Sequence, residues 1–188
     1  MIHTRHTFAC CLLSLLLLSA AWAERRRDPL TPPEIDELRD AAQEPDERLK
    51  LYVKFARARL DTLEKTRTDP KVTNRGQQVH DRLQDFLDVY DELNDNIDTF
   101  ADRKDDIRKT LKMIIDADTE FQAKLRALKD SATAGPEEAK QYEFLLANAL
   151  DTLDSSAQDH RQLLTEQEEL AKQKKLVKPD AQDSRKPH

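Results

Sequence analysis

One stretch of 58 residues, residues 77–134, most limits what this chain can fold into. It contains neither Gly nor Pro, and apolar residues recur along it in alternating steps of four and three. Of the 15 positions on this register, 13 are apolar, and only Lys104 and Asp118 interrupt it. Such a heptad pattern is typical of a helix that packs lengthwise against other helices, so the sequence predicts an all-α fold. The apolar positions are Val79, Leu83, Phe86, Tyr90, Leu93, Ile97, Phe100, Ile107, Leu111, Ile114, Phe121, Leu125 and Leu128.

Proline, glycine and capping residues indicate where the helices begin and end. Thr31, two prolines and Glu34 form a capping box with Pro at the first helical position. Pro45 can open a second helix, and the turns between the later helices contain the two glycines, Gly76 and Gly135. We therefore expect four helices, over about residues 32–42, 45–67, 77–134 and 136–176.

The second helix can pair with the third in an antiparallel way. When it is folded back about residue 73, five of its apolar residues meet apolar partners on the third helix. Charge supports this pairing, because residues 46–67 carry seven basic and four acidic residues whereas residues 77–102 carry one basic and eight acidic. The expected pairs are Leu63 with Leu83, Leu60 with Phe86, Ala56 with Tyr90, Val53 with Leu93, and Leu49 with Ile97.

The last helix can fold back about Gly135 in the same manner. His160 then falls on its apolar stripe, opposite about Leu111. Residues 137–171 hold two basic and nine acidic residues, and residues 103–130 hold eight basic and six acidic. An acidic helix again meets a more basic one, although each such contact contributes only a few tenths of a kcal/mol.

Two arrangements satisfy these registers. In the first, which the unbroken heptad phase favours, residues 77–134 form one continuous rod of roughly 85 Å with another helix on each half. A rod only two helices thick buries little apolar surface, so it implies a dimer. In the second, the chain folds near Ala101–Asp106 and two hairpins stack as a compact four-helix bundle. The bundle would bury the apolar residues beside the stripe, namely Leu87, Ile115, Leu145, Ala149 and Leu163.

The N-terminus has the features of a secretory signal peptide over residues 1–23. Arg5 precedes an apolar segment of about 14 residues, which ends in the small-x-small cleavage site Ala21-Trp22-Ala23. That segment is shorter than the roughly 20 residues of a membrane-spanning helix. We expect cleavage and export, to the periplasm or the medium. The alternative is an uncleaved anchor, which the positive charges of Arg25, Arg26 and Arg27 support.

Cleavage would leave a mature chain without thiols. Cys10, Cys11 and Trp22 all lie in the leader, so the mature chain has neither Cys nor Trp. Residues 24–178 would form a single helical domain, and the polar, unpatterned residues 179–188 a disordered tail. Thiol catalysis, disulfides and thiolate metal sites are then excluded. The two glycines of the chain are also too few for a P-loop, a dinucleotide fingerprint or a nucleophile elbow.

The histidines of the mature chain, His80, His160 and His188, form no recognisable catalytic or metal motif. His80 and His160 each have an Asp as sequence neighbour, but adjacent residues on a helix do not face each other. A di-iron bundle needs Glu three residues before each ligand His, and these positions are Gln77 and Ala157. We therefore predict no catalytic, cofactor-binding or metal-binding residues and no cofactor, with His160 a tolerated polar residue of the core.

Lys104 and Asp118, the two polar interruptions of the stripe, allow two interpretations each. A polar residue buried among apolar ones can fix the register of paired helices at a cost in stability. Alternatively, each side chain reaches the surface or marks a local break in the helix, and the sequence favours this second interpretation. Lys104 would then lie opposite Gln167.

Two charged surfaces remain as candidate contact sites. Cations at the end of the last helix complement its dipole, or could contact anionic lipid or cell-wall polymer; they are Lys172, Lys174, Lys175 and Lys178. An acidic stripe on the outer side of the third helix could attract a cation or a basic partner, or simply be solvated. Its members are Asp81, Asp85, Asp88, Glu92, Asp95, Asp102 and Asp106. Nucleic acid is excluded as a partner by the net charge of −6 and the lack of aromatic residues among the basic ones.

The sequence therefore predicts an exported, non-catalytic helical protein. It would act through protein–protein contacts or self-association, as a structural spacer, an adaptor or a chaperone-like protein of the cell envelope. A second hypothesis is an envelope-surface binder whose basic ends, Arg25–Arg27 and Lys172–Lys178, touch anionic polymers or lipids. A remote third is an enzyme with a site of carboxylates and His160.

Overall fold

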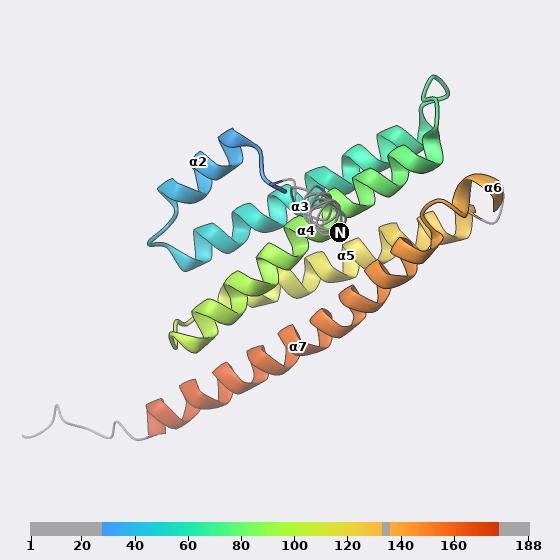
Figure 1. The fold of residues 1–188 in the computed structure, drawn as a ribbon. Coiled ribbons are helices and arrows are strands. Elements are labelled where there is room, and N and C mark those ends of the chain that lie inside the picture. Colours follow the sequence, from blue (N-terminus) through green and yellow to red (C-terminus); the bar gives the residue numbers. More distant parts are fainter. Residues whose placement is uncertain (1–27, 133–135, 177–188) are drawn as a thin grey trace, which may run out of the picture.

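The computed structural model describes residues 28–132 and 136–176, and all of its regular elements are helices (Figure 1). The all-α prediction is confirmed. The expected signal peptide, the residues Arg25, Arg26, Arg27 and Lys178, and the C-terminal tail lie outside the described residues. The helices are α2 (Pro32–Asp40), α3 (Pro45–Thr68), α4 (Arg75–Asp102), α5 (Arg108–Ala132), α6 (Pro136–Ala139) and α7 (Glu143–Leu176).

The continuous helix expected over residues 77–134 is not formed, and the rod that depends on it is wrong. Helix α4 ends at Asp102 and α5 begins at Arg108. Between them, Lys104 adopts a positive φ of 64°, which a residue inside a right-handed helix cannot have. The interruption falls near Ala101–Asp106, where the chain folds back in the four-helix bundle arrangement. A run of five charged residues, 102–106, offers no apolar side chain that a continuous helix could bury there.

Folding at this point brings the apolar stripes of α4 and α5 together. The ring of Phe86 lies edge-on to that of Phe121, with centroids 5.5 Å apart. The hydroxyl of Tyr90 donates a hydrogen bond of 2.8 Å to Asp118, which is 28 residues further along the chain. In one straight helix these two residues would be about 42 Å apart. The two halves of the heptad stripe thus share one core.

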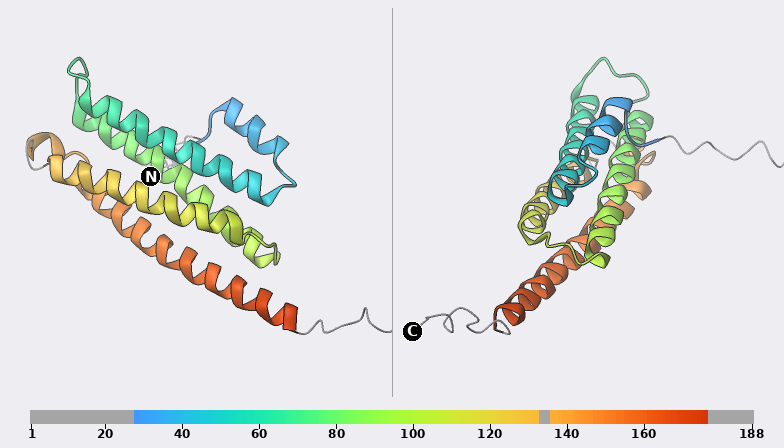
Figure 2. Two further views of the ribbon diagram at one scale, coloured as in Figure 1. Left: turned by 180° about the vertical axis from the view of Figure 1, so that it is seen from behind. Right: turned by 90° about the vertical axis from the view of Figure 1, so that its left-hand side faces the viewer.

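Four long helices lie side by side around this core (Figure 2). Helix α3 packs along α4 and α5 packs along α7, and further contacts join α3 to α5 and α4 to α7. All ten residues of the expected α3–α4 pairs are buried. The buried set is wider than a strict heptad stripe, because Tyr52, Phe55, Leu87, Val89 and Ala117 are buried as well.

The hairpin between α5 and α7 is longer than a turn at Gly135. The short helix α6 and a turn at residues 140–142 precede α7. These residues shift the register, so His160 does not lie opposite Leu111 but contacts Asp118, one heptad further along α5. At the other end, the side chain of Gln167 bonds the backbone of Asp105 and Ile107, next to the break that contains Lys104.

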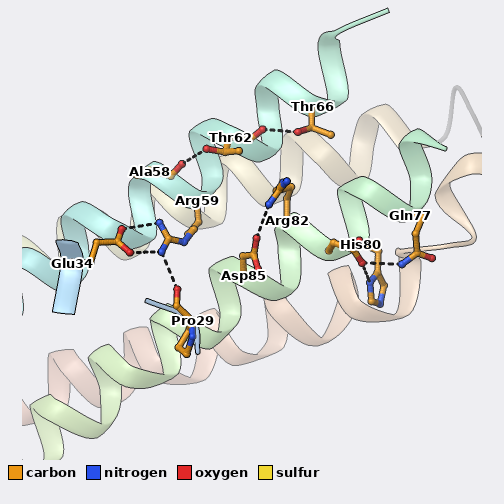
Figure 3. A network of polar contacts seen from close by, with 11 residues as sticks. Pro29, Glu34, Ala58, Arg59, Thr62, Thr66, Gln77, His80, Arg82 and Asp85 are labelled. Carbon is orange, nitrogen blue, oxygen red and sulfur yellow. Dashed lines mark hydrogen bonds and ion pairs between the residues drawn. The ribbon is translucent and has the colours of Figure 1, made fainter. Parts of the chain in front are cut away.

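Helix α2 is attached to the outside of α3 by half-buried polar contacts. The guanidinium of Arg59 donates to both carboxylate oxygens of Glu34, at 2.8 and 2.6 Å, and to the carbonyl of Pro29 (Figure 3). Glu34 also accepts from the backbone N–H and hydroxyl of Thr31, which completes the predicted capping box. Burial raises the pKa of Glu34, but the hydrogen bonds from Arg59 and Thr31 outweigh it, so the pKa is lowered overall.

Charge is distributed unevenly over the bundle. Three cations of α3 pair with α2 or α5, as in Lys54–Glu37 and Arg57–Glu120, and two pair within α3. No ion pair joins α3 to α4 among the described residues. The expected attraction between basic α3 and acidic α4 therefore produces no ion pair among the described residues, although Arg48 of α3 donates a hydrogen bond of 2.8 Å to the side chain of Asn96 on α4. Between α5 and α7 the attraction does produce ion pairs, in Arg126–Asp154 and Lys112–Glu168. Among the described residues, the acidic side chains of α4 are thus not paired with the basic side chains of α3.

None of the described helices is both long enough and apolar enough to cross a membrane.

The close contact of α4 with α6 gives a first prediction. A Cβ atom at Gly76 would lie 2.6 Å from the carbonyl oxygen of Glu138 and 2.8 Å from the side chain of Gln141. Alanine is a better helix former than glycine by roughly 1 kcal/mol, but the clash with backbone should outweigh that gain. We expect Gly76→Ala to lower the free energy of unfolding by about 1–2 kcal/mol net, measured by urea denaturation.

The matched control is Gln77→Ala, the next residue on α4, whose side chain is exposed and bonds only Asp81. That variant should unfold within about 0.5 kcal/mol of the unchanged protein. If Gly76→Ala stabilises the protein instead, α6 does not press against α4 as described.

Candidate functional site

Buried polar side chains joined by hydrogen bonds form a chain across the core, from α4 through α5 to α7. Asp118 of α5 has no exposed surface and accepts two hydrogen bonds of 2.8 Å, one from the hydroxyl of Tyr90 on α4 and one from Nδ1 of His160 on α7. An ionised carboxylate can only accept, so Nδ1 of His160 carries the proton. Three helices therefore meet at one buried carboxylate.

Tyr90 is held as a neutral donor in this chain. Burial raises its pKa first, and the negative charge of Asp118 together with the hydrogen bond to it raises it further. A contact with Ser156 of α7 works in the opposite direction. The Oγ of Ser156 in turn accepts a hydrogen bond of 3.1 Å from the side-chain amide of Asn94 on α4. The polar chain thus joins α4 to α7 at two points.

The buried group of Tyr90, Asp118 and His160 suits a structural role. The side chain of His160 is only 5% exposed, and both oxygens of Asp118 are engaged by neighbours in the fold. A general acid or base must reach the proton it transfers on a substrate, directly or through one water. A buried carboxylate shared by three helices instead fixes their register, since any slip leaves it without donors. His160 is a polar residue of the core, as predicted, and has a specific partner.

The other candidate histidine, His80, lies on the outer side of α4. Its Nδ1 is 3.4 Å from the carboxylate of Asp81, which also accepts a hydrogen bond from Gln77 (Figure 3). The side chain of His80 is about one-third exposed, and no other helix contributes to this group. Among residues 28–132 and 136–176, no three His, Cys, Asp or Glu side chains lie close enough together to hold a metal ion. His188 lies outside the described residues.

The two polar interruptions of the heptad stripe have different structures. Lys104 is exposed in the turn between α4 and α5, so it marks a local break, as the sequence favours. Asp118 is completely buried, so the favoured interpretation is wrong for this residue. Its donors, Tyr90 and His160, are 28 and 42 residues away in the sequence, and only the fold brings them to it.

The acidic stripe lies mainly on the outer side of α4. Its first members are engaged within the helix, in the contacts of Gln77 with Asp81, Arg82 with Asp85, and Gln84 with Asp88. In the second half of α4 the acidic residues Glu92, Asp95, Asp98 and Asp102 make no ion pair with any described residue. Asp106 lies beyond α4 and pairs with Arg108. The C-terminal half of α4 thus carries four acidic side chains that form no ion pair with a described cation.

Residues 169–176, here called the α7 tip, project beyond the other helices (Figures 1 and 2). They carry three exposed lysines, Lys172, Lys174 and Lys175, and two exposed leucines. Leu170 is 51% exposed and Leu176 is 80% exposed, which sets them apart from the buried leucines of the core. The tip is therefore a basic helix end with apolar side chains in solvent.

Comparison with known proteins found no relative. No protein-family model matches the chain, and neither a curated protein nor a solved structure matches it. The candidates for function are therefore the buried polar chain, the acidic half of α4 and the α7 tip. Only the last two reach solvent.

The buried polar chain gives a second prediction. Tyr90→Phe removes a donor from Asp118 while keeping the ring that packs on Phe121. A buried acceptor that loses its partner costs about 1–3 kcal/mol, so the variant should unfold at lower urea concentration by that amount. The control is Tyr142→Phe, because the Tyr142 hydroxyl has no hydrogen-bond partner among the described residues. If Tyr90→Phe and Tyr142→Phe have the same free energy of unfolding, the hydrogen bonds to Asp118 do not hold the helices together.

Proposed function

We propose that this is an exported, non-catalytic helical protein that acts by contacting another macromolecule through the end of α7. The role fits a spacer, an adaptor or a chaperone-like protein of the cell envelope. The observation that carries the proposal is the α7 tip, a helix end that continues past its neighbours with Leu170, Leu176 and three lysines exposed. Isolated exposed leucines are common on protein surfaces, but here they lie on a segment that extends past the other described helices.

The polar interior supports a non-catalytic role. His160 and Asp118 are used to join helices, and their donors and acceptors face one another in the core. An enzyme of this chain would need its reacting groups at the surface, where His80 forms a polar contact with Asp81 alone among the described residues. Contact with a partner requires no such site.

Export rests on the N-terminal sequence. The apolar segment after Arg5 and the small-x-small motif at Ala21-Trp22-Ala23 predict cleavage before Glu24. A chain without Cys after that point would suit an oxidising compartment, because it has no thiol to be oxidised.

The third prediction concerns contact at the tip. A photo-crosslinking amino acid placed at Leu176, in cells that produce the protein, should give a discrete crosslinked product after irradiation. The same amino acid at Gln158, which is exposed in the middle of α7, should not. N-terminal sequencing of the same sample should begin at Glu24. Absence of any product at Leu176, or an equal product at Gln158, would contradict the proposal that the tip is the contact surface.

A second candidate function is binding to an anionic surface, which the three exposed lysines of the tip favour. Lysines beside exposed leucines are the combination that binds anionic lipid interfaces.

The fourth prediction tests this candidate by sedimentation with phosphatidylglycerol vesicles. If the candidate holds, the protein should sediment with them at low salt but not at high salt, and Lys172→Glu with Lys174→Glu and Lys175→Glu should abolish the effect. Vesicles of phosphatidylcholine are the matched control. Equal sedimentation with both lipids, or with neither, would remove this candidate.

A further inference from the structure

We propose that the partner of the α7 tip is a second copy of this chain, whose own tip packs antiparallel against it in the space beyond the end of α4. The inference rests on the proposed function, because it names the partner of the same surface. Three observations carry it: where α4 ends, which side of α7 is left uncovered there, and how charge is placed on the two helix ends.

The first observation is the unequal length of α4 and α7. The two helices run in the same direction (Figure 1), and the hydrogen bond between Asn94 and Ser156 places these residues at the same level. Eight residues later, α4 ends at Asp102, which is level with about Leu164 on α7. Helix α7 continues for about twelve more residues, or roughly 18 Å. The turn at residues 103–107 fills the first part of that length and is hydrogen-bonded to Gln167, and beyond Gln167 no described helix takes the position beside α7 that α4 occupied.

The second observation is the character of the uncovered side. Ser156, Leu163 and Leu170 are spaced by seven residues and so follow one side of α7, which faces α4 at Ser156. Leu163 is partly buried and still packs against the core. Leu170, one heptad further and past the level of Asp102, is 51% exposed. An apolar stripe that begins inside the bundle therefore continues outside it without a cover.

The third observation is complementary charge at the two helix ends. The last turn of α4 has no basic residue and carries Asp98 and Asp102, neither of which forms an ion pair with a described residue. A helix C-terminus also carries a partial negative charge. The α7 tip carries Lys174 and Lys175, neither of which forms an ion pair with a described residue, although Lys174 lies near enough to Asp106 to help lower the pKa of that carboxyl group. A tip placed beyond α4 would bring lysines to this negative end.

A second copy satisfies all three requirements at once. If two tips pair antiparallel about Leu170, each lies beyond the α4 of the other copy, with its Leu170 against the other Leu170. Because each copy both gives and receives a tip, the contact is two-fold symmetric and closes as a dimer. Two positive side chains, Arg103 and Lys104, follow α4 and would lie near the lysines of the incoming tip. Arg103 is the C-cap residue of α4, and its guanidinium lies over the ring of Phe100 and pairs with Asp105 at 3.3 Å, so part of its charge is already met by Asp105.

The pairing buries a short helix segment from each copy, which is small for a stable interface. We therefore expect a dimer that dissociates on dilution and weakens as salt screens its charges. Sedimentation velocity over a concentration series should show this monomer–dimer equilibrium for the unchanged protein.

Disulfide trapping tests the symmetry axis. In a background with Cys10→Ser and Cys11→Ser, Leu170→Cys should form a disulfide-linked dimer under mild oxidation, since the two residues 170 meet on the axis. Gln158→Cys, exposed on the same helix but far from the axis, is the control and should remain monomeric. Trapping of Leu170→Cys no greater than that of the control would overturn the inference.

Charge exchange tests the contact between the helix ends. Lys174→Glu with Lys175→Glu should weaken the dimer roughly tenfold, and so should Asp98→Lys with Asp102→Lys, because each creates like charges at both ends of the dimer. The four substitutions together restore opposite charges and should recover most of the affinity. A quadruple variant no tighter than either double variant would contradict the placement of the tips.

These outcomes separate the inference from the proposed function. If the purified protein is monomeric at every concentration while Leu176 still crosslinks to a different protein in cells, the second copy is refuted and the contact role stands. If the tip binds only anionic vesicles and never a second copy, the inference is equally refuted. If Leu176 gives no product and the protein is monomeric, both fail.

Discussion

The interruption of the heptad stripe at residues 103–107 is the constraint on which the rest of the structure depends. Five consecutive charged residues and a positive φ at Lys104 end one helix and allow another to start in the opposite direction. Without that reversal, residues 77–134 would form one long helix. Each part of its apolar stripe could then pack against only one other helix of the chain. With it, four long helices share a core, and residues outside the strict stripe, such as Tyr52 and Phe55, are buried too.

The reversal also explains how a charged residue can occupy the centre of this core. Asp118 would be isolated on a continuous helix, but in the folded arrangement Tyr90 and His160 supply a hydrogen bond to each of its oxygens. An unpaired buried carboxylate is costly, so this arrangement makes one alignment of α4, α5 and α7 better than its neighbours. The fixed register determines where α4 ends relative to α7. It therefore also determines which part of α7 has no helix packed against it on that side.

Much of the helical content was accessible from the sequence because its signals are local. The capping box at Thr31, the prolines and the heptad spacing depend on residues within a few positions of one another, and they predict α2 and α3 to within about two residues. What could not be predicted depends on distant residues. Lys104 and Asp118 look alike as interruptions of the stripe, yet one becomes a turn and the other a buried acceptor, because only Asp118 meets distant donors. The register of α7 was misplaced by one heptad because α6 and the turn after it lengthen a hairpin that Gly135 alone seemed to close. The acidic half of α4 was visible in the sequence, but its lack of ion pairs with α3 was not.

The measurement that tests this account most directly is the distance between α3 and α5. Asp61 and Lys124 form an ion pair across these helices, with 2.7 Å between their charged atoms. Spin labels on Asp61→Cys and Lys124→Cys, in a background without Cys10 and Cys11 and diluted with unlabelled protein, report that distance by pulsed electron resonance. The folded-back arrangement predicts a distance below about 25 Å, because the helices are neighbours and pack at roughly 8–10 Å between axes. A continuous helix through residues 103–107 would place the same labels about 58 Å apart, and a distance near that value would contradict the account.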